Sequence, residues 1–365
     1  MSDDEPRSVH LSSRVVDALT AAVLTAWRAE EDVVGLPRLI EALDRRTARW
    51  QDRPRDEPLR PADDIHAPAV GERWRFETSG ALREAVWQAG LKLRAPSLQA
   101  APRWSPEVQP ILRQALATAY EQTSVRFLGE LWLLQYIVGP TLPLVRPEHE
   151  FRLFVDGSPA CEAVDTLEVA GLLAQRSLLD WPGRVVTRVG RLTVPGWGGP
   201  MPFIFRRETI RQAVRFGATA TSQVHLIMAI CAVEWALEQT HNTFESRVAA
   251  TNRAGALLNE YGVWHLSILH DAMTDLPEYP VLGKDLACTR AAAARTARQE
   301  YGHRFIGTSH LLHAIVSDVG GRGSGRWRRS DVGGPGSRAL RTLGADPGEL
   351  RDRLDRELRQ AKQVW

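Results

Sequence analysis

A short block of apolar residues at helical spacing recurs four times along the chain. The last copy spans 302–315, and a shift of 85 positions places 217–230 on it without a gap. Shifts of 178 and 272 positions place 127–137 and 33–43 on the same pattern. A repeated block is typical of a repeat architecture, so we expect four related units. The residues identical between the last two copies are Gly217, His225, Leu226, Ala229 and Ile230.

The apolar positions within each block predict a helix. Leu311, Leu312 and Ile315 follow the i, i+1, i+4 pattern of one helical face. A second helix is expected before each block, joined to it by a short turn. These preceding helices are predicted over 12–29, 105–120, 206–216 and 284–301.

Helix-start signals accompany this pattern. Thr308 stands where an N-cap belongs, because its hydroxyl can accept from the free N–H groups of the first turn. Ser105 followed by Pro106 predicts another start at that serine. Asp346 before a proline and a glycine predicts a third. The apolar stripe expected to be buried in that last helix is Leu350, Leu354 and Leu358.

Three segments interrupt the helical pattern. Residues 44–78 and 320–336 are rich in polar, proline or glycine residues and are expected to form loops. Residues 148–205 include two apolar stretches, 151–156 and 185–194. A small β-hairpin fits this central segment, which also holds the expected linker between the halves of the chain.

Composition restricts the classes of protein. The 365 residues are 44% hydrophobic and 25% charged, which indicates a globular chain long enough for two domains. A net charge of +2 argues against a protein built mainly to hold nucleic acid. The three cysteines form no CxxC pair, which fits a reducing compartment. With a polar, acidic start and no apolar run of about twenty residues, we expect a cytoplasmic protein without a membrane partner.

The last block and the segment after it resemble a known family, the Clp N-terminal repeat of unfoldases such as ClpC and ClpA. That resemblance implies an all-α fold of two tandem Clp-N-like domains, each a pseudo-twofold pair of helical repeats. The residues that carry it are Gly302, His303, Ile306, Gly307, Thr308, His310, Leu311, Leu312, Leu343, Gly344, Ala345, Asp346, Leu350 and Arg351. The implied organisation is a first domain over 8–180 with repeats near 11–95 and 104–180, a linker over 181–200, and a second domain over 201–365 with repeats near 201–276 and 283–362.

The motor of an unfoldase is missing from the chain. No GxxxxGK[ST] phosphate loop occurs, and the one Gly-Lys pair, Gly283-Lys284, is followed by aspartate. We therefore expect no enzymatic activity and no cofactor. In ClpC relatives a glutamate in the repeat helps to bind phosphorylated arginine. The matching positions here hold no acid, which disfavours that ligand; they are Pro37, Leu131, Val224 and Ser309, with Glu130 one position away.

The family also binds ligands in a groove between two repeats, near the starts of their first helices. In the first half the matching set is apolar with one large aromatic residue, which suits an apolar peptide. That set is Leu11, Leu19, Thr20, Trp104, Ser105, Leu112, Leu116 and Tyr120. In the second half the counterparts are a poorer match, so the first half is favoured as the binding site. That secondary set is Gly283, Lys284, Cys288, Ala291 and Arg295.

Two other features suggest chemistry. His303, His310 and His313 lie close in sequence and two of them could share a metal ion. Packing is the favoured interpretation, because no carboxylate or cysteine completes a ligand set, and no metal is expected. The Gly- and Arg-rich stretch 321–329 contains one tryptophan and could contact nucleic acid, although a surface loop is the favoured interpretation.

Three functions remain open. The first is a decoy that binds cyclic peptide antibiotics directed at ClpC, or degron peptides, and so protects the ClpC protease system. The second is an adaptor or modulator that docks on ClpC or hands over its substrates. The third is a regulator that binds nucleic acid, which the near-neutral charge disfavours.

Overall fold

The computed structural model describes residues 10–48, 59–62, 74–122, 127–139, 162–174, 201–263, 283–317 and 334–361. These residues are mostly helical, which confirms the all-α expectation. The chain divides into two compact units, the first formed mainly by Met1–Ala160 and the second mainly by the residues from Cys161 onward. Each unit has its own hydrophobic core.

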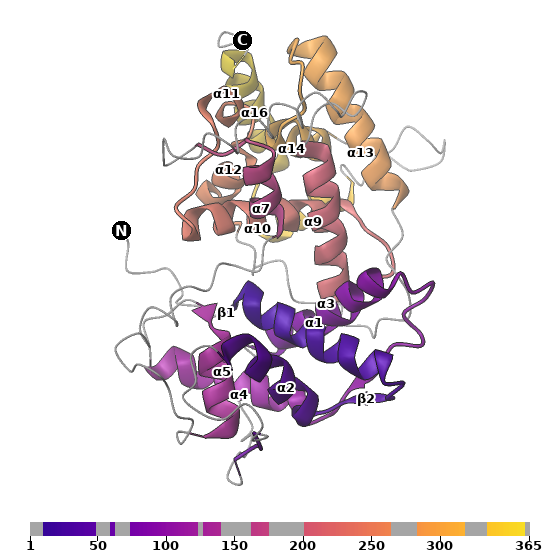
Figure 1. Ribbon diagram of the computed structural model, residues 1–365. Helices are drawn as coiled ribbons and strands as arrows, with labels where there is room; N and C mark the ends of the chain where they lie inside the picture. The colour runs from indigo at the N-terminus through magenta and orange to yellow at the C-terminus, as the bar shows by residue number, and fades with distance from the viewer. Residues whose placement is uncertain are drawn as a thin grey trace. The chain divides into compact units, whose positions relative to one another are not determined.

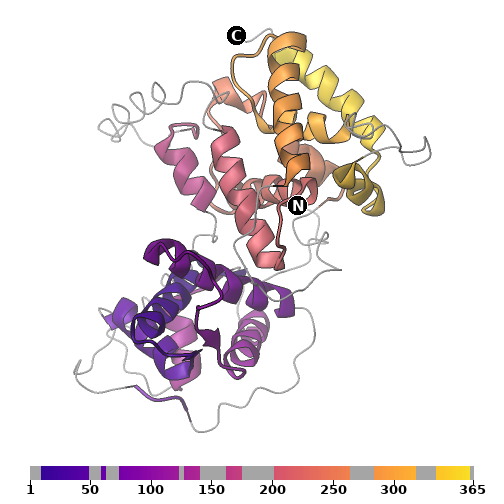
Figure 2. The same cartoon turned by 90° about the vertical axis from the view of Figure 1, so that its right-hand side faces the viewer.

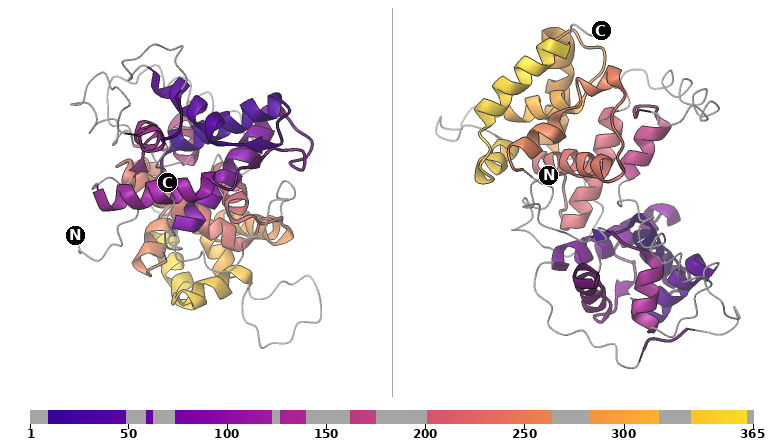
Figure 3. Two further views of the ribbon diagram at one scale, coloured as in Figure 1. Left: turned by 90° about the horizontal axis from the view of Figure 1, so that it is seen from below. Right: turned by 90° about the vertical axis from the view of Figure 1, so that its left-hand side faces the viewer.

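The first unit combines five helices, among its described residues, with two pairs of very short strands (Figure 1). The long helices α1 and α3 pack along one another, and α2 packs against both α1 and α5 (Figure 1 and Figure 3). In chain order the elements are β1 (His10–Leu11), α1 (Ser13–Arg28), β2 (Val33–Val34), α2 (Leu36–Thr47), α3 (Arg75–Leu93), β3 (Arg103–Trp104), α4 (Val108–Gln122), β4 (Phe127–Leu128) and α5 (Glu130–Val138).

Helix α1 shows how local sequence produces the core of the first unit. Ser12 caps it, because the serine Oγ accepts from the N–H of Val15 at 3.3 Å. Val15, Leu19 and Val23 recur at i+4 spacing and are fully buried, each at 0% exposure. Burying one such side chain contributes on the order of 2 kcal/mol, so this stripe fixes which face of α1 meets α2 and α3.

The four short strands pair reciprocally. β1, which precedes α1, pairs in parallel with β4, which precedes α5. β2, which precedes α2, pairs in parallel with β3, which precedes α4. Each pair is continued by one more backbone hydrogen bond, from Ser12 N–H to Leu128 O at 3.1 Å and from Ser105 N–H to Val34 O at 3.0 Å. The start of each repeat is thereby tied to the middle of the other repeat.

The described secondary structure of the second unit is mainly helical, with an isolated bridge between Leu173 and Phe244. Figure 2 shows its C-terminal helix α16, in yellow, against the orange helices of the same unit. The elements are α7 (Glu162–Val169), α9 (Met201–Phe216), α10 (Gln223–Gln239), α11 (Ser246–Ala249), α12 (Ala254–Glu260), α13 (Lys284–Arg295), the π-helix η4 (Thr296–Glu300), α14 (Thr308–Val316), α15 (Pro335–Thr342) and α16 (Pro347–Ala361).

Helix α7 belongs to the second unit. It packs against α10, and its Leu167 is a fully buried member of the second core. The sequence boundaries placed this helix in the first domain, whereas the division of the compact units falls between Ala160 and Cys161. The expected linker over 181–200 and both stretches of the expected hairpin lie outside the described residues.

The second helix of every repeat starts in the register that the sequence shifts give. Helices α2, α5, α10 and α14 begin at residues 36, 130, 223 and 308, which are related by shifts of 272, 178 and 85 positions to the last. Their N-cap residues, Gly35, Gly129, Ser222 and Gly307, all have extended backbones. The starts of these four helices therefore keep the register of the repeated block.

Two predicted caps are wrong in detail. The N-cap of α14 is Gly307, and the Thr308 hydroxyl instead accepts from the N–H of Ala254 in α12 at 3.4 Å. Helix α4 begins at Val108, because Ser105 starts a turn that the Val108 N–H closes onto the Ser105 carbonyl at 3.1 Å. In both cases a residue with capping chemistry serves a tertiary contact or a turn just before the helix.

Other predicted elements are confirmed or shifted. The Asp346 carboxylate accepts from the Gly348 N–H at 2.8 Å at the start of α16, as its sequence predicts. Leu350, Leu354 and Leu358 are fully buried. The expected loop over 44–78 is shorter than predicted, since α2 continues to Thr47 and α3 begins at Arg75. In the described part of the chain, no helix is both long enough and apolar enough to cross a membrane.

Candidate ligand-binding cleft

The residues predicted to line a groove in the first half come together, but mainly as core. Leu11, Leu19, Leu112 and Leu116 are at most 1% exposed and belong to one hydrophobic cluster. Their side chains therefore contact other core residues. In this structure the aliphatic residues of the predicted groove therefore expose little surface to a ligand.

The polar and aromatic residues of that first set also make hydrogen bonds or packing contacts within the unit. The Thr20 hydroxyl donates to the carbonyl of Val16 at 2.8 Å. The indole N–H of Trp104 donates to the Leu82 carbonyl at 3.1 Å, and its ring packs on the core. Tyr120 packs on the same core, with its ring 5.5 Å from that of Trp74. Ser105 forms the turn described above.

The residues of the secondary set are mostly exposed, unlike the buried leucines of the first set. Lys284, Cys288, Ala291 and Arg295 are exposed and form one stripe on α13. Gly283, the N-cap of that helix, is half-buried and donates its N–H to the Thr221 hydroxyl at 3.0 Å. None of these five residues lines the cleft described next.

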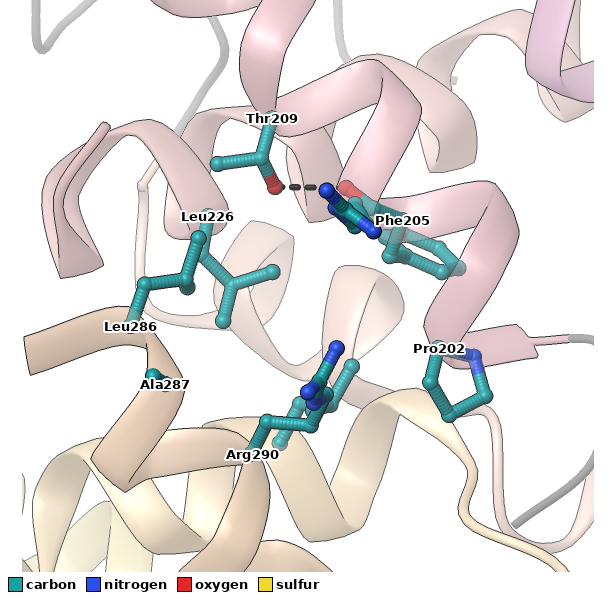
Figure 4. A pocket seen from close by; sticks show the side chains of 9 residues that line it. Pro202, Phe205, Thr209, Leu226, Leu286, Ala287 and Arg290 are labelled. Atoms are coloured by element: carbon teal, nitrogen blue, oxygen red, sulfur yellow. Dashed lines mark hydrogen bonds between the residues drawn. The ribbon is translucent and has the colours of Figure 1, made fainter. Parts of the chain in front are cut away.

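A small cleft that opens to solvent lies within the second unit, between α9 and α13, with one residue each from α10 and α14 (Figure 4); its empty volume is about 350 Å³ with open solvent included. Its apolar residues include Phe205 on α9, Leu286 on α13, and Leu226 and Leu311 on the two block helices. The full lining is Pro202, Phe205, Arg206, Thr209, Leu226, Leu286, Ala287, Arg290 and Leu311. A concave, mainly apolar site with a few polar groups is typical of ligand binding.

The cleft lies where the two repeats of the second unit meet. Three pairs of its lining residues are related by the 85-position shift of the sequence repeat. These pairs are Pro202 with Ala287, Phe205 with Arg290, and Leu226 with Leu311. The Leu226 and Leu311 pair was visible in the sequence as the residue after each repeated histidine. Whether these two leucines line a cleft depends on how α9 and α13 pack against each other. No sequence pattern indicated that packing.

Two arginines give the cleft its charge. Arg290 reaches into the cleft from α13 and points toward the side formed by α9 (Figure 4). On α9, the Nε of Arg206 is buried and has no hydrogen-bond partner among the described residues. The Thr209 hydroxyl donates to the carbonyl of Phe205 at 2.5 Å, so its proton is already used within the helix. The cleft is therefore apolar and cationic.

The repeated histidines have a structural role. His225 Nδ1 accepts from the N-cap N–H of Ser222 at 3.0 Å, and His310 Nδ1 accepts from that of Gly307 at the same distance. Burial lowers the pKa of His225 to about 4, opposed by the charge of Asp285. Burial, and then the neighbouring histidines, lower the pKa of His310 to about 3. Both rings are neutral at pH 7 and act as caps.

The other two candidate metal ligands belong to the same buried network. His303 Nδ1 lies 2.8 Å from His310 Nε2, and His313 Nε2 lies 3.1 Å from the Asp355 carboxylate. Tyr301 donates to that carboxylate, and its pKa is raised by burial and then by Asp355. Among the described residues, no group of three His, Cys, Asp or Glu is arranged to hold a metal ion.

No protein-family model matches the chain, and no curated protein is similar to it at a significant level.

Proposed function

We propose that the chain is a non-enzymatic, cytoplasmic peptide-binding protein built from two tandem Clp-N-like domains. Its binding site is the cleft of the second unit. Its role is that of a decoy, which takes up peptides that ClpC also binds, either cyclic peptide antibiotics or degron peptides. It would thereby protect the ClpC protease system.

The repeat geometry supports the Clp-N-like organisation. Four helices begin at positions related by the sequence shifts, and in the first unit the strands before the helices pair reciprocally. Reciprocal pairing is what two similar units related by a twofold rotation produce. The histidines at 225 and 310 cap matched helices in the second unit with the same atom.

The single observation that carries the binding proposal is the cleft itself. Phe205, Leu226, Leu286 and Leu311 line it, each at most 6% exposed, and a ligand gains about 25 cal/mol for each Å² of their apolar area that it removes from water. The proposal moves the site from the first half, which the sequence favoured, to the second. The reason is the cleft itself, because the apolar residues at both places are buried in their cores.

Calorimetric titration of the full chain tests this proposal. The ligands are a cyclic peptide directed at ClpC and a linear peptide with apolar side chains. Ala287 is exposed and lines the cleft, so Ala287→Trp fills the cleft with little cost to folding. We expect it to weaken binding at least tenfold. Ala291→Trp, also exposed on α13 and outside the lining, is the matched control and should bind like the wild type.

The same titration separates the other roles. Absence of heat with either class of peptide contradicts the proposal. Binding to purified ClpC that survives Ala287→Trp supports an adaptor that docks through another surface. Salt-dependent binding to DNA or RNA supports the regulator, because displaced counterions make such binding weaken as salt rises.

A further inference from the structure

We infer that the cleft of the second unit recognises the C-terminal end of a linear peptide whose last residue is apolar. The inference rests on the proposed function and narrows it. It selects linear peptides over cyclic ones, and a chain end over an internal segment. The carboxylate would lie between Arg206 and Arg290, and the last side chain would lie against Phe205, Leu226, Leu286 and Leu311.

The charge of the lining points to an anion. Arg206 and Arg290 are the charged residues of the described lining, and they stand on the two facing helices α9 and α13. The Arg206 Nε is buried without a hydrogen-bond partner in the described part of the chain. A buried donor without an acceptor costs free energy, and a carboxylate is the acceptor that fits a guanidinium best. Of the residues that the structure describes, no acidic side chain lines the cleft.

The closeness of apolar and cationic groups points to a terminal residue. Phe205 and Arg206 are consecutive on α9, and Leu286 and Arg290 are one helical turn apart on α13. A ligand must therefore present its carboxylate close to its apolar group. In the last residue of a peptide both groups leave the same Cα. In an internal acidic residue next to an apolar one they leave different Cα atoms, about 3.8 Å apart.

The shortage of side-chain hydrogen-bond acceptors in the lining favours a chain end over an internal segment. A segment that crosses the cleft carries N–H groups on both sides of its buried side chain, and these need acceptors. Apart from the arginines, which only donate, Thr209 is the one residue of the described lining with a polar side chain; its hydroxyl donates to the Phe205 carbonyl, which leaves its oxygen as the single side-chain acceptor of that lining. A chain end brings fewer N–H groups and adds two carboxylate oxygens for the arginines.

The test compares two forms of one peptide by calorimetry on the full chain. The probe is an N-acetylated hexapeptide ending in Leu-Phe, used as the free acid and as the C-terminal amide. We expect the amide to bind at least tenfold more weakly than the acid. In the Arg206→Gln variant, the acid should fall to the affinity of the amide. Arg207→Gln, which changes the adjacent exposed arginine outside the lining, should keep the tenfold difference.

The outcomes separate this inference from the proposed function. Equal affinities of acid and amide for the wild-type chain overturn the inference and leave peptide binding in the cleft intact. An equal loss for both forms in Arg206→Gln also overturns it, because the arginine would then act without the carboxylate. Failure of the acid, the amide and the cyclic peptide to bind contradicts the inference and the proposed function together.

Discussion

The two units start their matched helices at the same register but satisfy the free N–H groups in different ways. In the second unit, histidines at the third helical position of α10 and α14 reach back to the N-cap. In the first unit, the equivalent positions of α2 and α5 hold Arg38 and Trp132, and neither N-cap glycine has a side-chain hydrogen bond. The repeat thus preserves backbone position while the chemistry at that position changes.

The two predicted grooves also differ in their surroundings. The two predicted sets lie in opposite environments, with Leu112 and Leu116 fully buried in the first unit and Cys288 and Ala291 exposed in the second. A family site transferred by register alone therefore identifies positions on a helix without identifying the face that meets solvent. Substitutions in both units test this comparison.

The largest effect is expected from Leu116→Ala. Leu116 is fully buried in the first core, so its truncation should lower the free energy of unfolding by about 3 kcal/mol through lost burial and a cavity. Cys288→Ser, in the exposed stripe of α13, should change it by less than about 0.5 kcal/mol. Urea denaturation followed by circular dichroism measures both. A loss below about 1 kcal/mol for Leu116→Ala would mean that this position faces solvent.

The N-cap glycines of α14 and α2 differ in the space that a side chain would have. A Cβ added at Gly307 would lie 2.1 Å from the carbonyl oxygen of Thr251, so Gly307→Ala should cost about 3 kcal/mol by overpacking. A Cβ at Gly35 would first meet Pro37 at 3.4 Å, an ordinary contact, so Gly35→Ala should cost less than about 1 kcal/mol. Denaturation midpoints check the pair, and equal losses would contradict the close approach of α14 to Thr251.

The histidine caps predict a dependence on pH that is confined to the second unit. The folded pKa of His225 is about 4, below the ordinary 6.5, so its contribution to stability is present above pH 6.5 and is lost as the pH falls towards 4. His310 acts in the same direction. Glu234 opposes them, because burial and then Glu238 raise its pKa to about 7 and its contribution is lost as the pH rises from 4.5 through 7.

His225→Gln isolates the histidine effect. Glutamine at this position can still accept from the N-cap N–H but does not titrate. Between pH 7 and pH 5 the wild type should lose about 1 to 2 kcal/mol more than this variant, since lowering a pKa by one corresponds to about 1.4 kcal/mol. Thermal denaturation at the two pH values provides the measurement. Parallel losses in both proteins would show that His225 is not the group that titrates.

The smallest effects come from two side-chain caps, one in each unit. Ser12 caps α1 and Asp346 caps α16, each through a side-chain oxygen that accepts from a first-turn N–H. Ser12→Ala and Asp346→Ala should each cost about 1 kcal/mol, without changing ligand binding. Urea midpoints test the stability, and calorimetry tests the binding. A much larger cost for either would indicate a tertiary role for that residue.

Sequence reasoning predicted local features well where the determinant was local. The Asp346 cap and the Leu350 stripe depend on residues within a few turns, and the helices that begin at 36, 130, 223 and 308 keep the register of the repeated block. The Thr308 cap was wrong because its hydroxyl contacts α12, which is distant in sequence. The cleft was missed for the same reason, since its walls come from α9 and α13 and become a surface only after those helices pack.

The location of the binding site is the central claim, and hydrogen exchange of the full chain tests it most directly. Amide exchange is measured by mass spectrometry with and without a saturating hexapeptide ending in Leu-Phe as the free acid. We predict that the peptide slows exchange in 202–209 of α9 and 286–290 of α13, and leaves α1 and α4 unchanged. Slowed exchange confined to α1 and α4 would place the site in the first unit and contradict the account.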